Sequence, residues 1–388
     1  MTPDPRELFR GRIAAHLGLK ADQVSLFAKG RVALYAILRA LDVGPGDEVI
    51  LPAFTCVAVP NAILYAGARP IYVDIDAASF TIDPTATANA IGPRTRVILA
   101  QNTFGLAADL DSLEAIAAGR GATVVDDCTH GLGGHVGGRP TGSTAPASFF
   151  STQWSKPLST GLGGFAVALD DSLAARVRDL EETAREPPAA RVALLRVLVR
   201  GRDRAGNGRL LRAGRAAYRL LSRAGMVPAS SNRDELEGVA MPAGFLTRLS
   251  AWQASLGAAR LDRVVPDLEA RRSIARRYSA WLADNGRIGA LERPGSIHTF
   301  LRYPIRVHDR PAFEAAAAKA RVDLGDWFVS PIHPVTAGWA RWGYEAGTAP
   351  TAEAACAEIV NLPVAATMSP AEVDRVIRFL DATSDLIR

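Results

Sequence analysis

Residues 121–164 hold most of the side chains that could carry out chemistry. A β-branched run, Thr123 to Val125, ends in Asp126 and Asp127, and His130 follows three residues after the second acid. A short apolar run bounded by turn residues predicts a buried strand. Ligands of open α/β sheets bind outside the carboxyl ends of the strands. We therefore expect both acids at a ligand-binding edge of a sheet.

A lysine follows the next predicted strand in the same stretch. The apolar run Ala147 to Phe150 leads to Ser151 and, five residues later, to Lys156. Arginine stays protonated in proteins, whereas a partly desolvated lysine can lose its proton and act as a nucleophile. Lysine is rare here, because 41 arginines accompany only four lysines: Lys20, Lys29, Lys156 and Lys319.

An acid and a lysine at one edge of a sheet match the needs of pyridoxal 5′-phosphate. The acid can pair with the pyridinium nitrogen, and the lysine can form a Schiff base with the aldehyde. The same residues are compatible with a plainer interpretation, in which Lys156 is a loop lysine and Asp127 an N-cap of a helix. The spacing alone leaves both interpretations open.

The order of these elements resembles the DegT/DnrJ/StrS group of pyridoxal-phosphate-dependent sugar aminotransferases. That group carries an acid–Asp–small–small–Gln/His run, then Ser-x-x-x-x-Lys, then Thr-Gly-x-Gly-Gly. The corresponding segments here are Asp126 to His130, Ser151 to Lys156, and Thr160 to Gly164. The resemblance covers nearly the whole chain except an arginine-rich segment at about 187–231.

Strands alternating with helices predict an α/β fold with a mainly parallel sheet covered on both faces. The resemblance implies the aspartate aminotransferase fold, fold type I of the pyridoxal-phosphate enzymes. On that basis we expect a cofactor-binding large domain at 1–250, which includes the insert, and a smaller α+β domain at 251–388. It also implies a homodimer.

The resemblance assigns roles to particular side chains. Lys156 would hold the cofactor as a Schiff base and move the substrate proton, Asp127 would face the ring nitrogen, and His130 would bind the phenolic oxygen. Ser151 and the helix N-terminus at Gly30 to Val32 would hold the phosphate, since free N–H groups there favour an anion. The expected cofactor-binding residues are Gly30, Arg31, Val32, Cys56, Asp127, His130, Ser151 and Lys156.

Two positions depart from the family pattern. Cys56 stands where many relatives place an aromatic side chain that stacks on the cofactor ring, and a free cysteine is more commonly a small buried apolar residue. Leu246 stands where relatives have an asparagine that reaches the partner subunit's phosphate, a contact that Thr247 or Arg248 could take over. The candidate substrate contacts are Asn102, Arg248 and His333.

The arginine-rich segment differs in charge from the rest of the chain. Residues 185–223 have a balance of +9, so the remainder sums to −4. The pattern predicts two basic amphipathic helices separated by Gly201 to Gly208. Such helices can lie on an anionic membrane, meet an acidic ligand, or pack on their own protein as a hairpin, and packing would bury Leu211, Tyr218 and Leu221.

The expected reaction is transfer of an amino group, with glutamate as donor, to a keto sugar on a nucleotide carrier. Alternatives are an enzyme acting on a lipid-linked or non-sugar ketone, and a non-catalytic protein of this fold that uses the insert for binding or assembly. A family dehydratase would carry a histidine in place of Lys156.

The composition of the chain and its N-terminal residues indicate the cellular compartment. The N-terminal residues show no secretory signal, and no apolar run reaches the ~20 residues of a membrane span. The cysteines Cys56, Cys128 and Cys356 are scattered and match no metal-ligand spacing, which favours a reducing compartment. We expect a cytoplasmic enzyme with no metal ion and no nucleic-acid partner, and the insert is the candidate for a peripheral contact with the membrane.

Overall fold

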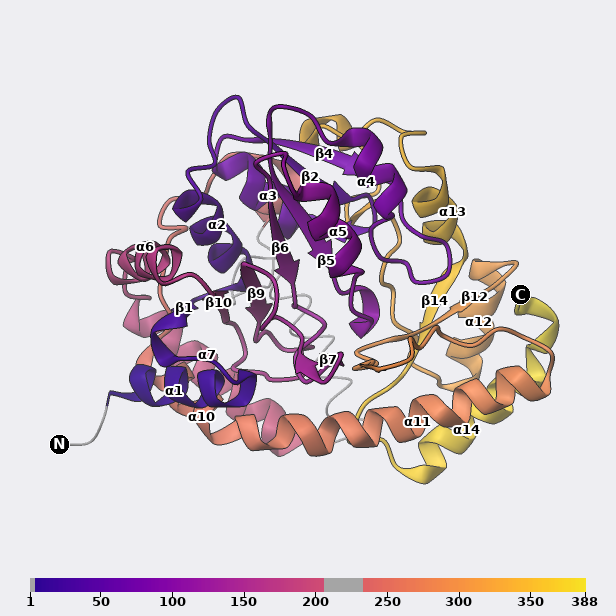
Figure 1. The fold of residues 1–388 in the computed structure, drawn as a ribbon. Helices are drawn as coiled ribbons and strands as arrows, with labels where there is room; N and C mark the ends of the chain where they lie inside the picture. The colour runs from indigo at the N-terminus through magenta and orange to yellow at the C-terminus, as the bar shows by residue number, and fades with distance from the viewer. Residues whose placement is uncertain (1–3, 206–232) are drawn as a thin grey trace.

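A seven-stranded sheet forms the centre of the protein (Figure 1). The computed structural model describes residues 4–205 and 233–388. Strands β9, β6, β5, β2 and β4 run parallel, whereas β10 is antiparallel to both β9 and β1. The predicted α/β fold with a mainly parallel sheet is confirmed. In sheet order the strands are β1 (Val24–Phe27), β10 (Gly164–Ala168), β9 (Ala147–Ser151), β6 (Thr123–Asp127), β5 (Thr95–Gln101), β2 (Glu48–Pro52) and β4 (Arg69–Val73).

Helices alternate with these strands and continue after them. Before the insert they are α1 (Pro5–Leu17), α2 (Gly30–Ala40), α3 (Ala58–Tyr65), α4 (Pro84–Ala90), α5 (Leu110–Ala117), α6 (Asp171–Glu182) and α7 (Ala189–Ala205). From residue 233 onward they are α9 (Arg233–Glu237), α10 (Ala251–Arg260), α11 (Val264–Asp284), α12 (Arg310–Ala320), α13 (Pro350–Glu358) and α14 (Pro370–Ala382). The short outlying strands are β3 (Thr55–Cys56), β7 (His135–Val136), β8 (Arg139–Pro140), β11 (Ser296–Ile297), β12 (Tyr303–Arg306), β13 (Ile332–His333) and β14 (Ile359–Leu362).

The apolar strands are buried on both faces of the sheet. Successive side chains of a strand point to opposite faces, so each strand contributes to the core on either side. Val97 and Leu99 of β5 pack with α2, α3 and α6 in the largest core cluster. Ile98 and Ala100, the alternate residues of the same strand, pack instead with α4 and α5. The sheet therefore has helices on both faces.

A second apolar core lies in the C-terminal part of the chain. It joins α11, α12 and α14 to the antiparallel pair β12–β14, around buried side chains such as Tyr278, Phe313 and Phe379. In Figure 1 the long helix α11 runs from the neighbourhood of α10 to this group of elements. Loops from the C-terminal part of the chain return to the edge of the large sheet, where β13 pairs with β3.

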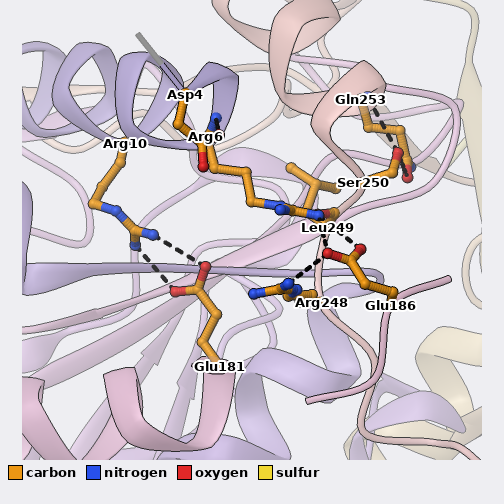
Figure 2. A network of polar contacts seen from close by, with 9 residues as sticks. All are labelled: Asp4, Arg6, Arg10, Glu181, Glu186, Arg248, Leu249, Ser250 and Gln253. Carbon is orange, nitrogen blue, oxygen red and sulfur yellow. Dashed lines mark hydrogen bonds and ion pairs between the residues drawn. The ribbon is translucent and has the colours of Figure 1, made fainter. Parts of the chain in front are cut away.

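A buried ion pair fastens α1 to α6. Both terminal nitrogens of Arg10 donate to the carboxylate of Glu181, at 3.0 and 3.1 Å, and both side chains are almost completely buried. Figure 2 shows this pair beside a second cluster, in which Arg6 and Arg248 meet at Glu186.

Helix α7 is the described part of the arginine-rich insert. The predicted helix break at Gly201 is wrong, because α7 continues to Ala205. A glycine inside a helix costs about 1 kcal/mol, which contacts on both sides of it offset here. Val199 is buried, and Arg202 donates a hydrogen bond to the carbonyl oxygen of Trp154 at 2.6 Å. The predicted second helix, with Leu211, Tyr218 and Leu221, lies outside the described residues.

None of the helices in the described part of the chain is long and apolar enough to cross a membrane.

Replacing Glu181 by glutamine tests the α1–α6 pair. The variant leaves a buried guanidinium facing a neutral amide, so we expect the free energy of unfolding to fall by about 3 kcal/mol. The control is Glu314→Gln in the more exposed pair with Arg310, where we expect a change of about 0.5 kcal/mol or less. Urea unfolding followed by circular dichroism measures both, and equal effects would contradict the importance of the buried pair.

Candidate active site

The sheet topology brings the functional residues of the sequence to one edge. Asp127 ends β6 and Ser151 ends β9, and these neighbouring strands are parallel. Gly164 begins β10 and pairs with Ser151 and with Phe27, the last residue of β1. Because β10 runs antiparallel to both neighbours, its first residue lies at the edge where their last residues lie. After two intervening residues, α2 begins at Gly30 on the same edge.

Lys156 is buried at this edge, in the loop that joins β9 to β10. Its side chain is 7% exposed, and its Nζ lies over the indole ring of Trp327, 4.7 Å from the ring centroid. Burial lowers the pKa of Lys156 from 10.5 to about 7, with a further lowering by Arg302, against the opposing effects of Asp127 and Cys56. A substantial fraction of this amine is therefore unprotonated at neutral pH.

The two consecutive acids occupy different environments, since neighbouring strand residues face opposite sides. Oδ1 of Asp127 accepts a hydrogen bond from the backbone N–H of Thr129 at 2.9 Å, and Lys156 interacts with this carboxylate. Oδ2 of Asp126 instead accepts from the N–H of Gly142 at 3.1 Å. Burial raises the pKa of both, that of Asp126 to about 7. Asp127 is thus the acid that shares an electrostatic environment with Lys156.

His130 is fixed in one tautomer. The backbone N–H of Phe104 donates to its Nδ1 at 3.2 Å, so the neutral ring carries its proton on Nε2. Burial, together with Lys156 and Arg302, lowers the pKa of His130 well below its ordinary value. The ring stacks on Trp327 with centroids 4.8 Å apart and planes 11° from parallel. Nε2 of His130 is therefore available as a hydrogen-bond donor.

The N-terminus of α2 is closely packed against the start of β10 and the end of β9. A Cβ on Gly164 would lie 2.4 Å from the backbone nitrogen of Gly30, and a Cβ on Gly30 would lie 3.1 Å from Cβ of Ser151. This approach requires glycine at 164, and a side chain at position 30 would make unusually tight contacts. Ser151, Gly30 and Arg31 are thus brought together as predicted, while the N–H of Val32 already donates to the carbonyl of Lys29 at 3.1 Å.

Two cations flank this helix N-terminus and share one buried carboxylate. Nη1 of Arg31 and Nζ of Lys29 lie 2.6 and 3.3 Å from the carboxylate oxygens of Glu235 in α9. Asn61 fixes α9 in place by donating to the backbone carbonyl of Glu235 at 2.8 Å. Burial is the largest of several causes that lower the pKa of Lys29 to about 8. The sequence did not point to Glu235, because no local pattern relates it to Lys29 and Arg31, which lie more than 200 positions earlier.

The predicted substrate residues are spread more widely. His333 pairs with Cys56 in the β13–β3 ladder, and Cys56 is among the groups that influence the pKa of Lys156. The amide of Asn102 is used internally, accepting from the N–H of Ala108 at 3.0 Å and donating to Sγ of Cys128 at 3.3 Å. As a substrate contact Asn102 stays a prediction, since its side chain is already committed to the fold.

Arg248 lies in a different network. Its guanidinium pairs with Glu186 at 2.5 Å, next to Arg6, as Figure 2 shows. The hydroxyl of Thr247 donates to the carbonyl of Gly244 at 2.6 Å, and Leu246 packs against the main core. Both side chains considered as replacements for the missing asparagine therefore have contacts within their own chain, and a role for Arg248 in substrate or partner binding stays a prediction.

Trp327 and Arg302 are functional candidates that the sequence did not reveal. The guanidinium carbon of Arg302 lies 4.6 Å from the centroid of the Trp327 ring, and the same ring contacts Lys156 and His130. Both residues come from the C-terminal half of the chain, more than 140 positions after Lys156. A local pattern cannot indicate contacts at that separation.

The residues at this edge fit pyridoxal 5′-phosphate. Lys156 is a buried amine with a pKa near neutrality, Asp127 is a carboxylate near it, and His130 presents an N–H. The α2 N-terminus, crowded by Gly164 and flanked by two cations, suits a phosphate. These observations match the donor set that this cofactor needs.

The low pKa of Lys156 can be tested without any ligand. We expect competitive labelling with acetic anhydride across pH to give a reactivity midpoint for Lys156 at about 7, because burial favours the neutral amine. Peptide mass spectrometry separates the four lysines, and exposed Lys319 serves as the internal reference. A midpoint near 10 would contradict the described burial.

Comparisons with known proteins agree on one family. The sequence profile of the DegT/DnrJ/EryC1/StrS aminotransferase family matches residues 4–381. A UDP-2-acetamido-2-deoxy-3-oxo-D-glucuronate aminotransferase from Pseudomonas aeruginosa is 31% identical over 317 residues, 79% of this chain and 80% of that protein. A UDP-N-acetyl-3-dehydro-alpha-D-glucosamine 3-aminotransferase from Acidithiobacillus ferrooxidans is 40% identical over 154 residues, 39% of this chain and 42% of that protein.

The solved structures give the same result for the fold. The aminotransferase TlmJ from Streptoalloteichus hindustanus superposes with a TM-score of 0.76 at 26% identity, covering 98% of this chain and 91% of that one. The match with the family profile extends over almost the whole chain. The protein therefore belongs to the DegT/DnrJ/EryC1/StrS aminotransferase family, whose members are pyridoxal-phosphate-dependent transaminases.

Proposed function

We propose that this enzyme transfers the amino group of an α-amino acid, with glutamate as the leading donor, to the carbonyl carbon of a keto sugar carried on a nucleotide. The products are the 2-keto acid and the amino sugar. The observation that carries the proposal is the buried Lys156 amine, with a pKa near neutrality, beside Asp127 and His130. The relatives named above support the acceptor, since both act on UDP-linked sugars with a ketone.

Pyridoxal 5′-phosphate, when bound, supplies an aldehyde that condenses with amines and a ring that accepts the electron pair left at the reacting carbon. Lys156 has two tasks in this account: its Nζ holds the cofactor between reactions and moves a proton at the substrate carbon during them. A pKa of about 7 suits both tasks, because the amine accepts and returns the proton with similar ease near neutral pH.

Asp127 and His130 tune the cofactor's ring. The carboxylate of Asp127 would hold a proton on the pyridine nitrogen, which increases the ring's capacity to accept electrons. Nε2–H of His130 would donate to the phenolic oxygen, because the hydrogen bond from Phe104 to Nδ1 places the proton of the neutral ring on Nε2. Protonation of His130 is disfavoured by burial, so it remains a single-proton donor through neutral pH.

The phosphate and the ring face have candidate partners as well. The N–H groups at Gly30 and Arg31, with the Ser151 hydroxyl, would hold the phosphate, and the side chains of Lys29 and Arg31 add positive charge. Trp327 is an aromatic side chain beside Lys156. We assign to Trp327 the stacking on the cofactor ring that Cys56 cannot supply.

Arg302 is placed to bind the donor's α-carboxylate. In an α-amino acid the carboxylate is attached to the carbon that carries the amino group, so it must lie close to Nζ of Lys156. Arg302 and Lys156 both contact Trp327, with their charged groups 4.6 and 4.7 Å from the ring centroid. A guanidinium can stack on an aromatic ring and bind a carboxylate through the five N–H donors in its plane, and Arg302 already uses Nη1 to donate to the carbonyl oxygen of Leu301 at 3.0 Å.

The proposal extends to assembly and location. We retain the homodimer and a cytoplasmic setting as proposals, supported by the family resemblance, and sedimentation equilibrium tests the first. The apolar side of α7 packs on its own protein, with Leu195 and Val199 buried. Contact of the insert with an anionic membrane stays a proposal, and salt-sensitive flotation with anionic liposomes, lost on deleting residues 187–230, would support it.

Asp127→Asn tests the overall function. We expect the variant to fold and to bind the cofactor but to lose at least about 100-fold in amino transfer, because the ring nitrogen loses its charged partner. Mass spectrometry detects the amino sugar formed from glutamate and the UDP-linked 3-keto sugars. Failure of the wild-type enzyme to aminate any keto sugar would contradict the substrate class, and full activity of the variant would contradict the role of Asp127.

Arg302→Gln tests the donor site. Loss of a charge-assisted pair costs about 1.5–3 kcal/mol, so we expect the half-saturating glutamate concentration to rise by about 10- to 100-fold. The half-reaction with the keto sugar should be unaffected. The control is Arg306→Gln, four residues later, whose guanidinium lies over Phe80 and pairs with Glu358. A defect confined to the keto-sugar half-reaction would overturn the assignment.

A further inference from the structure

We propose that helix α7 is a brace for the loop that carries Lys156, with Arg202 and Val199 as positioning residues for that lysine. The loop runs from Thr152 to Gly163, between β9 and β10. Its significance as a catalytic loop rests on the function proposed above, while the brace is inferred from the contacts that α7 makes with the loop and with Arg260. The brace gives a role to the described part of the arginine-rich insert.

The loop is closed at its base by its own hydrogen bonds. The N–H of Thr152 donates to the carbonyl of Gly163 at 2.9 Å, and the N–H of Thr160 donates to the carbonyl of Thr152 at 2.8 Å. Lys156 lies in the body of the loop, where its N–H donates to the carbonyl of Gln153 at 3.0 Å. External contacts on the body of the loop therefore affect where the lysine is held.

Arg202 contacts the loop two residues before Lys156. Its Nη1 donates to the carbonyl oxygen of Trp154 at 2.6 Å, and its guanidinium lies over the Trp154 indole, 5.5 Å from the ring centroid. The charged donor and the stacking contact act on the same residue. They fix both the backbone and the side chain of Trp154 relative to α7.

A second polar contact is made three residues after Lys156. Arg260 of α10 donates to the carbonyl of Ser159 at 2.7 Å and pairs with Asp203 of α7 at 2.5 Å. Asp203 thereby orients the arginine that binds the loop. The loop is thus bound on both sides of the lysine, once directly by α7 and once through an ion pair with it.

The apolar face of α7 packs against the end of the loop. Gly161 has φ of +84°, and a Cβ there would lie 2.8 Å from Cγ2 of Val199 and 3.0 Å from Cδ1 of Leu195. Leu162, Leu195 and Val199 form one buried cluster with Trp154, Trp252 and Leu256 at its margin. The close approach requires glycine at 161, and it makes the loop sensitive to the volume of Val199.

The brace acts on Lys156 through burial. The charged and titratable groups that affect this amine are Asp127 of β6, Cys56 of β3 and Arg302 before β12, and the neutral ring of His130 is close enough to respond to it. None of these groups belongs to α7. Loosening the loop therefore leaves these partners in place and admits water, which favours the protonated amine.

A matched pair of substitutions on α7 tests the apolar contacts between this helix and the loop that carries Lys156. Val199→Ala removes two methyl groups beside Gly161, whereas Val197→Ala makes the same change at a side chain that is 66% exposed. Competitive acetylation of the cofactor-free protein measures the pH midpoint of Lys156, with exposed Lys319 as reference. We expect the midpoint to rise by at least about one pH unit in V199A, a tenfold loss of neutral amine, and to stay unchanged in V197A.

Arg202 is tested by charge-matched variants. Arg202→Gln should raise the Lys156 midpoint, and Arg202→Lys should restore it, because lysine can still donate to the Trp154 carbonyl and lie over the ring. Arg196→Gln removes the same charge from an exposed position of α7 and should have no effect. Circular dichroism melting shows which variants are folded, and only folded variants are compared; if V199A does not fold, the comparison of R202Q with R202K decides.

Two outcomes would overturn the brace. One is an unchanged Lys156 midpoint in both V199A and R202Q, and the other is an equal rise in V197A or R196Q, which would indicate a general effect of the helix or of its charge. The labelling uses neither cofactor nor sugar. Its result is therefore independent of whether the proposed acceptor is correct.

Discussion

Desolvation of a single amine is the constraint on which the rest of the site depends. An ordinary lysine is almost fully protonated at neutral pH and cannot act as a nucleophile or as a base. Burial of Lys156 against Trp327 lowers its pKa by more than the nearby carboxylate of Asp127 raises it. Arg302, a second cation near the lysine, acts in the same direction. The fold holds these groups where their opposing effects leave the amine close to half protonated near pH 7.

The sheet accounts for how distant segments reach that amine. Five parallel strands place their carboxyl ends on one edge, and the antiparallel β10 brings its first residue to the same place. Gly164 can then pack directly on Gly30 at the start of α2. Loops from the C-terminal part of the chain complete the site by adding Trp327 and Arg302 to this edge. The large sheet thus supplies the lysine and the acid, and the later segments supply the surface that buries them.

The local part of this arrangement could be predicted from the sequence. Apolar runs, glycines and strand-terminal acids indicated the α/β fold and the edge that carries Asp127, Ser151 and Lys156. Contacts between distant segments could not be predicted, because a pattern of neighbouring residues carries no information about packing. Trp327, Arg302 and Glu235 were missed for that reason. Gly201 was misjudged as a helix break because contacts from Val199 and Arg202 on either side outweigh its local preference.

The most direct test of this account asks which lysine carries the cofactor. Lys29 is the informative competitor, because it too is largely buried, has a pKa of about 8 and lies at the same edge of the sheet. The protein is incubated with pyridoxal 5′-phosphate, reduced with borohydride, and mapped by peptide mass spectrometry. The account predicts that the pyridoxyl group is attached to Lys156 and that the Lys156→Ala variant carries none. Attachment to Lys29, or undiminished attachment in the variant, would contradict it.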